Sequence, residues 1–123
     1  MSNSDSGRKP ERVDLYLIKP SCYDDEGYVV RYFRGVLPSN TLACLAALTE
    51  SARSDPALNG YDIRVHLIDE TVMRVNTGKI RRAALKGTRT LVGLVGVQTH
   101  QYPRALDLAR EFRRVGIPVL IGG

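Results

Sequence analysis

The two runs that decide the fold are LVGLVGV at residues 91–97 and IPVLIGG at residues 117–123. Each begins as a short, unbroken apolar stretch, and the segment between them has the spacing of an amphipathic helix. Such runs are typical of strands buried on both faces, as in the parallel sheets of α/β domains. These sheets bind ligands at the carboxyl ends of their strands. The pattern therefore predicts an α/β domain with a ligand site beyond Val97 and Ile121.

The whole chain alternates between the periods of strands and helices. Strands are predicted at residues 13–18, 62–68, 91–97 and 118–121. Helices are predicted at residues 41–53, at residues 77–86, and from near Pro103 to a left-handed cap at Gly116. A short additional helix is expected in the long connection at 20–38, where apolar side chains recur at helical spacing: Tyr28, Val29, Tyr32, Phe33 and Val36.

This alternation predicts a doubly wound parallel sheet with right-handed crossovers. Arg64 and His66 make one side of the second strand polar, which indicates an edge strand, whereas the third strand is apolar throughout. Both features fit the flavodoxin-like order, of which strands 2-1-3-4 are present. The fifth strand of that order is absent, so we expect the chain to be truncated after Gly123. We then expect the uncharged fourth strand to be an unprotected edge, through which the chain aggregates or pairs edge to edge.

Composition restricts the class of protein. The chain has 123 residues, 43% of them hydrophobic, and no apolar run long enough to span a membrane. Residues 1–12 are polar and lack the apolar centre of a signal peptide, so we expect a disordered tail, one α/β domain at residues 13–123, and a cytoplasmic location. Cys22 and Cys44 are predicted to be free thiols, with Cys44 buried in a helix; no zinc or iron–sulfur spacing is present.

The charge is distributed unevenly along the chain. Residues 1–62 carry 7 basic against 9 acidic side chains, and residues 63–123 carry 11 against 4, which gives net charges of −2 and +7. A basic half is compatible with nucleic-acid or phosphate binding. The arginines, however, lie on the polar sides of two predicted helices without interleaved aromatic residues. Solvated helix faces are therefore the favoured interpretation, and nucleic-acid binding is the weaker alternative.

Three loops should converge on one crevice at the carboxyl ends of the strands, at residues 19–27, 98–102 and 122–123. None carries a GxGxxG or P-loop phosphate motif. The acidic run at residues 24–26 lacks a partner ligand elsewhere in the crevice and is interpreted as a solvated turn rather than a metal site. No catalytic constellation can be assembled around His66, interpreted as a surface residue, or His100, interpreted as a helix-entry residue or a ligand contact. Gly93 and Gly96 fit either close helix packing or a bulky ligand.

Two long segments carry a family resemblance: LYLIKPSCYDDEGYVVRYFRGVLPSNTLACL at residues 15–45 and LVGLVGVQTHQYPRALDLAREFRRVGIPVLIGG at residues 91–123. The chain resembles the N-terminal, cobalamin-binding-like domain of a group of radical S-adenosylmethionine proteins. Three stretches are distinctive, namely IKPS-x-YDD-x-GYV, PSNTLACL and VGLVGVQ-x-x-Q-x-PRALDLAR. The resemblance covers nearly all of the chain beyond its N-terminal tail.

The resemblance implies a cofactor site with one departure from the pattern. Cobalamin domains carry DxHxxG after their first strand, a Ser or Thr after the third, and Gly-Gly after the fourth. Thr99 and Gly122-Gly123 match the last two, but the stretch at residues 21–27 has no histidine to serve as a lower axial ligand. The CxxxCxxC motif for the 4Fe-4S cluster and S-adenosylmethionine belongs to a catalytic domain that this chain lacks. Whether the chain belongs to an enzyme is therefore left open.

The leading hypothesis is a corrinoid-binding module of a cobalamin-type radical enzyme. It has no catalytic and no metal-ligating residue of its own, and its partners are a corrinoid and the missing C-terminal catalytic domain. The rival hypothesis keeps the fold but makes it a cofactor-free scaffold that docks on a catalytic domain. A crevice filled by Tyr23, Tyr28 or Phe33 would favour that rival. The predicted cofactor-binding residues are Ser21, Tyr23, Gln98, Thr99, His100, Gly122 and Gly123.

Overall fold

Four parallel strands form a single sheet in the order β2-β1-β3-β4, as seen in a computed structural model that describes residues 10–31 and 40–122. The strands are β1 (Glu11–Lys19), β2 (Tyr61–Asp69), β3 (Arg89–Leu94) and β4 (Val119–Ile121). The strand order confirms the flavodoxin-like α/β fold that the sequence predicts.

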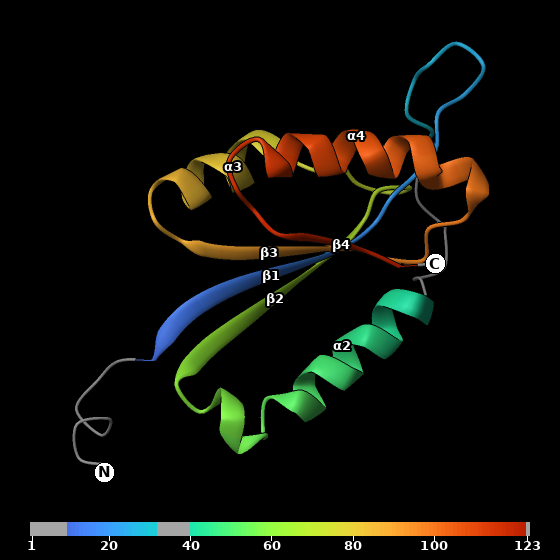
Figure 1. Cartoon of the computed structure of the whole chain (residues 1–123). Helices are drawn as coiled ribbons and strands as arrows, with labels where there is room; N and C mark the ends of the chain where they lie inside the picture. Colours follow the sequence, from blue (N-terminus) through green and yellow to red (C-terminus); the bar gives the residue numbers. More distant parts are fainter. Residues whose placement is uncertain (1–9, 32–39, 123) are drawn as a thin grey trace.

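Helices cover both faces of this sheet (Figure 1). On one side lies α2 (Asn40–Ala52), and on the other lie α3 (Thr77–Leu85) and α4 (Tyr102–Arg113). Two 3-10 turns, η1 (Pro56–Leu58) and η2 (Thr99–Gln101), complete the connections. Within the described ranges, no helix has the length and apolar character needed to cross a membrane.

The main core fills the space between the sheet and the α3/α4 layer. Phe112, Ala105 and Leu108 of α4 are buried there against Ile18 and Leu94 of the two central strands. On the opposite face, Val13 and Leu17 of β1 are buried beneath α2. Apolar residues on both faces of β1 explain why the first strand, like the third, is central.

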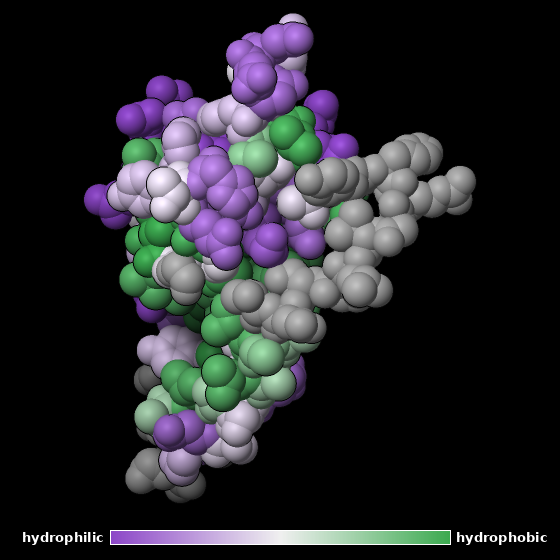
Figure 2. All heavy atoms as spheres, turned by 90° about the vertical axis from the view of Figure 1, so that its right-hand side faces the viewer, coloured by the Kyte–Doolittle hydropathy of each residue, from purple (hydrophilic) through white to green (hydrophobic). Residues whose placement is uncertain are grey.

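The α2 face of the sheet is only partly covered. Side chains alternate along a strand, and the registry therefore places Leu91 and Leu120 on the same face as Leu17. Leu91 is 40% exposed and Leu120 is 79% exposed. Figure 2 looks onto the carboxyl ends of the strands and shows hydrophobic residues gathered between the polar α4 side and α2. An apolar surface therefore lies beside α2 on this face.

Most predicted elements appear within two residues of their expected bounds, with four differences. β1 begins at Glu11, so residues 11 and 12 of the expected tail lie in a strand, and β3 ends at Leu94 rather than at 97. The short helix expected in the long connection is wrong in its described part, because Tyr23 and Val29 form an antiparallel bridge there; Tyr32, Phe33 and Val36 lie outside the described residues.

Cys44 is exposed on α2 rather than buried, while Cys22 is partly buried.

Gly93 in β3 and Gly96 in the loop after β3 are each explained by the surrounding protein structure. A Cβ atom at Gly93 would lie 3.2 Å from Cδ2 of Leu17, so the neighbouring leucine fills the space that this glycine leaves. Gly96 has a φ of +64°, which L-residues rarely adopt, and it turns the chain after β3. Packing and turn formation therefore account for both glycines without a ligand.

Candidate functional site at the carboxyl edge

Backbone contacts tie the ends of β1, β3 and β4 into one surface. The Val95 N–H donates to the Ile18 carbonyl at 2.9 Å, and the Val97 N–H donates to the Gly122 carbonyl at 2.9 Å. The side-chain amide of Gln101 then donates to the Pro20 carbonyl at 3.0 Å. The three predicted loops thus converge at the carboxyl edge of the sheet, as the strand order requires.

The outer part of this edge is an open platform formed by Gln98, Thr99, His100 and Gly122. All four residues are exposed. The Gln98 N–H donates to Oε1 of Gln101 at 2.9 Å, which fixes the start of η2. Among the described residues, its chain neighbours aside, no heavy atom lies within 4 Å of the position that a Cβ would take at Gly122, so a ligand can approach the backbone there. Gly123, the last predicted site residue, lies outside the described residues.

The loop after β1 contacts a largely buried ion pair that the sequence does not predict. Glu70 is fully buried directly after β2, and Arg104 projects from the first turn of α4. Nε of Arg104 lies 3.0 and 3.2 Å from the two carboxylate oxygens, and Nη2 lies 2.6 Å from Oε2. This forked geometry is the one that makes arginine–carboxylate pairs strong. The pair joins the end of β2 to α4 across the crevice.

Tyr23 extends this pair into a network. Its hydroxyl accepts from Nη1 of Arg104 at 3.2 Å and donates to Oδ2 of Asp107, one turn further along α4. The Arg104 guanidinium also lies 5.7 Å from the centre of the Tyr23 ring. Burial, and then the hydrogen bond to Asp107, raise the pKa of Tyr23. The hydrogen bonds to Glu70 contribute most to a raised pKa of Arg104, which keeps its charge throughout the accessible pH range.

Ser21 also forms its hydrogen bonds within the protein and is not exposed on the platform. It is buried, its N–H donates to Oε1 of Glu70 at 3.1 Å, and its hydroxyl donates to the Val30 carbonyl. Ser21 and Tyr23 are both predicted to border the crevice, and the structure places them in the loop after β1 at the carboxyl edge, with their polar groups in internal contacts. Their polar groups hold the loop after β1 against Glu70 and α4.

The acidic run after β1 forms the tip of a small hairpin. Oδ1 of Asp24 accepts from the N–H groups of Glu26 and Tyr28, each at 2.9 Å, and all three acidic side chains are exposed. This geometry matches the predicted solvated turn. Among the described residues, no three histidine, cysteine or acidic side chains lie close enough to hold a metal ion.

The other histidine, His66, is interpreted from the sequence as a surface residue, but its ring has defined contacts within the protein. The His66 ring stacks on Tyr16, with centroids 4.4 Å apart, and its Nε2 lies 3.2 Å from Oδ1 of the buried Asp14. The same oxygen accepts from Nε of Arg12 at 3.2 Å. Asp14 thus has two side-chain partners, and the guanidinium of Arg12 supplies a compensating charge, which explains how a carboxylate can lie buried within β1.

Two sequence signals could have identified the buried network. Glu70 is the first residue after a strand, where side chains reach the crevice. Arg104 and Asp107 lie three positions apart in a helix, so they share one side of α4. Arg104 and Asp107 lie in the distinctive stretch PRALDLAR, but Glu70 lies outside all three distinctive stretches, and only the fold brings it next to α4. Comparisons with family models, with characterised proteins and with solved structures found no match to this chain.

Proposed function

We propose that the domain is a corrinoid-binding module that works together with a separate catalytic domain. The observation that carries the proposal is the open platform of Gln98, Thr99, His100 and Gly122 at the carboxyl edge of a flavodoxin-like sheet. Parallel α/β sheets bind cofactors at this edge, next to the point where the strand order reverses. Here that point lies between β1 and β3.

The chemistry of the platform suits a large, flat cofactor with amide-bearing edges. Gln98 and Thr99 offer side-chain hydrogen-bonding groups, and the unobstructed backbone at Gly122 would let a nucleotide tail lie against the chain. His100 carries the imidazole on this surface. A bound corrinoid would supply a cobalt centre able to carry an alkyl group, and this chain would hold and orient it.

The buried network contributes rigidity to this site. The pair of Glu70 and Arg104, extended through Tyr23, fixes the loop after β1 on one side of the crevice. Gln101 links the same loop to η2, which carries the platform residues on the other side. A site supported by such contacts is ordered before the ligand arrives, which reduces the entropic cost of binding.

The test is titration of the chain with hydroxocobalamin, followed by the corrin absorbance and by thermal unfolding. Gly122→Leu should weaken binding at least tenfold, because its side chain would occupy the space above the backbone. Gly60→Leu is the matched control, since it is also open but lies at the opposite edge. Failure of the wild-type chain to change the spectrum at saturating cofactor, or equal loss in both variants, would refute the proposal.

The second candidate is a cofactor-free scaffold that docks on a catalytic domain. It is favoured by the internal use of Tyr23, whose hydroxyl and ring are engaged by α4, and by the apolar surface at Leu91 and Leu120. This candidate predicts binding to a domain that carries the CxxxCxxC motif, without cobalamin, and weaker binding after Leu120→Asp. Binding that requires cobalamin would decide against it.

A further inference from the structure

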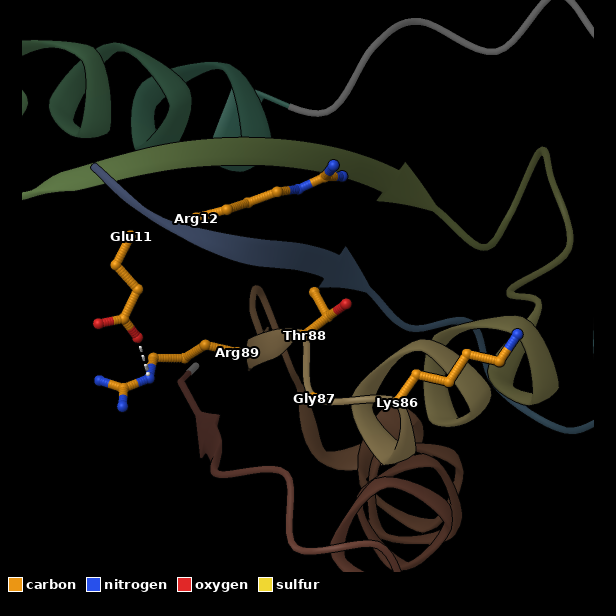
Figure 3. A pocket seen from close by; sticks show the side chains of 6 residues that line it. All are labelled: Glu11, Arg12, Lys86, Gly87, Thr88 and Arg89. Carbon is orange, nitrogen blue, oxygen red and sulfur yellow. Dashed lines mark ion pairs between the residues drawn. The ribbon is translucent and has the colours of Figure 1, made fainter. Parts of the chain in front are cut away.

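A polar hollow lies at the amino edge of the sheet, where the strands begin, opposite the carboxyl-edge platform. It encloses about 470 Å³ between the start of β1 and the turn that leads from α3 into β3 (Figure 3). Its lining residues are Glu11, Arg12, Lys86, Gly87, Thr88 and Arg89. This hollow is separate from the carboxyl-edge platform and does not depend on its function.

The lining carries three cationic side chains and one carboxylate. The carboxylate belongs to Glu11, which pairs with Nε of Arg89 at 2.8 Å. Figure 3 shows this pair at the left, whereas the side chains of Arg12, Thr88 and Lys86 extend to the right of it. This second group presents two cations and a hydroxyl, and the carboxylate of Asp14 lies 3.2 Å from Nε of Arg12.

These three groups have unused hydrogen-bonding capacity. Arg12 uses Nε for the buried carboxylate of Asp14, and its two terminal nitrogens have no partner in the described part of the chain. Within the same residues, Lys86 forms no ion pair and the Thr88 hydroxyl makes no hydrogen bond. The side chain of Asp14 is only 5% exposed, so the surrounding residues fix its position. Its carboxylate therefore anchors one end of the Arg12 guanidinium.

The end of α3 does not account for the position of Lys86. Carbonyls at the end of a helix need donors, and lysine side chains often lie near them. Here the backbone N–H of Lys86 donates to Arg82, that of Gly87 to Ala84, and that of Thr88 to Ala83. The carbonyls of Arg82, Ala83 and Ala84 are thus satisfied by backbone groups and do not need the Lys86 ammonium.

We propose that this hollow binds a small phosphorylated molecule. The two terminal nitrogens of Arg12, the Lys86 ammonium and the Thr88 hydroxyl line the same hollow, and this set of donors suits the several oxygens of a phosphate better than a single carboxylate. The volume exceeds that of one phosphate group and leaves room for further phosphates or an organic body. The site gives the basic half of the chain a local binding function, in place of an extended nucleic-acid surface.

The test uses tripolyphosphate as the probe and the backbone amide signals of Gly87, Thr88 and Arg89 as the readout, at low ionic strength. We expect saturable shifts confined to these residues and to the start of β1. Lys86→Gln and Thr88→Val should each weaken binding several-fold, and together at least tenfold. Lys79→Gln is the matched control, because it removes the same charge from the opposite end of α3.

Three outcomes would overturn the proposal. The first is the absence of saturable shifts at low salt. The second is equal weakening by Lys79→Gln and Lys86→Gln, which would indicate general attraction to a basic surface. The third is binding of a single-stranded oligonucleotide without binding of tripolyphosphate, which would assign the cations to a nucleic-acid surface. Melting temperatures of the variants without probe exclude unfolding as the cause of any loss.

Discussion

The pair of Glu70 and Arg104 should be the most sensitive polar contact in the described part of the molecule. Arg104→Met leaves a fully buried carboxylate without its cation, and breaking such pairs costs about 3–5 kcal/mol. That is a large part of the roughly 5–15 kcal/mol that stabilises a typical domain. Urea unfolding should therefore show a strongly lowered midpoint.

Two controls separate the ion pair from general damage. Glu70→Gln combined with Arg104→Met removes both charges and should recover part of the lost stability. Arg114→Met breaks an exposed pair with Glu111 and should change the free energy of unfolding by less than about 1 kcal/mol. Equal effects of Arg104→Met and Arg114→Met would show that the buried pair has no special role.

Tyr23 should make stability depend on alkaline pH. Burial and the bond to Asp107 raise its pKa above the value of 10.0 for a free tyrosine, so the folded state binds the proton more tightly than the unfolded state. This contribution is complete below pH 10 and is lost as the pH rises through the folded pKa. The urea midpoint should fall in that window, and Tyr23→Phe should make the fall shallower. Tyr28→Phe, at a residue 69% exposed, should leave it unchanged.

At the scale of elements, the end of α4 depends on the backbone of Gly116. This residue has a φ of +81°, and nothing lies within 4 Å of its would-be Cβ, so any effect of a side chain acts through the backbone alone. Gly116→Ala should destabilise the protein by about 1–2 kcal/mol. Gly60→Ala, equally open but without a positive φ, should be neutral or slightly stabilising. Thermal unfolding of both variants checks this, and equal melting temperatures would contradict it.

The sequence predicted the elements well where their periodicity is carried by core residues. Phe112, Leu108 and Ala105 mark α4, and the continuous apolar character of β3 correctly indicated a central strand. The failure at residues 28 and 29 has a physical reason. Tyr28 and Val29 have helical spacing from later apolar residues, but the backbone there pairs with Cys22 and Asp24 across a turn that Asp24 caps. The periodicity of apolar residues contains no information on such pairing between two segments of the backbone.

The candidate site was only partly predictable for a related reason. Strand order follows from local patterns, and it correctly brings the loops of Ser21, Gln98 and Gly122 to one edge. The buried pair depends on two residues 34 positions apart, whose meeting is decided by how α4 crosses the end of β2. The exposure of Cys44 likewise reflects which side of α2 faces the sheet, and the prediction that this cysteine is buried was wrong because the sequence pattern of α2 did not identify that side.

At the scale of the whole molecule, β4 is an edge strand without protection. Val92 donates to the Pro118 carbonyl and Gly122 donates to the Leu94 carbonyl, so by alternation the backbone groups of Val119 and Ile121 point away from β3. No strand among the described residues pairs with that side. The neighbouring side chains carry no charge, and charge is a common means of preventing edge-to-edge contact.

We therefore expect the chain to self-associate through β4, and Leu120→Lys to reduce this. Leu120 is 79% exposed, and complete burial of a leucine is worth about 1.5–3 kcal/mol, so two copies that pair along their edges gain from both leucines. A lysine at this position would place like charges opposite each other in an antiparallel pair. Leu85→Lys makes the same change at a leucine that is 69% exposed on α3 and should leave association unaffected. Sedimentation velocity over a range of concentrations measures the outcome, and a wild-type monomer throughout would show that the open edge is stable alone in water.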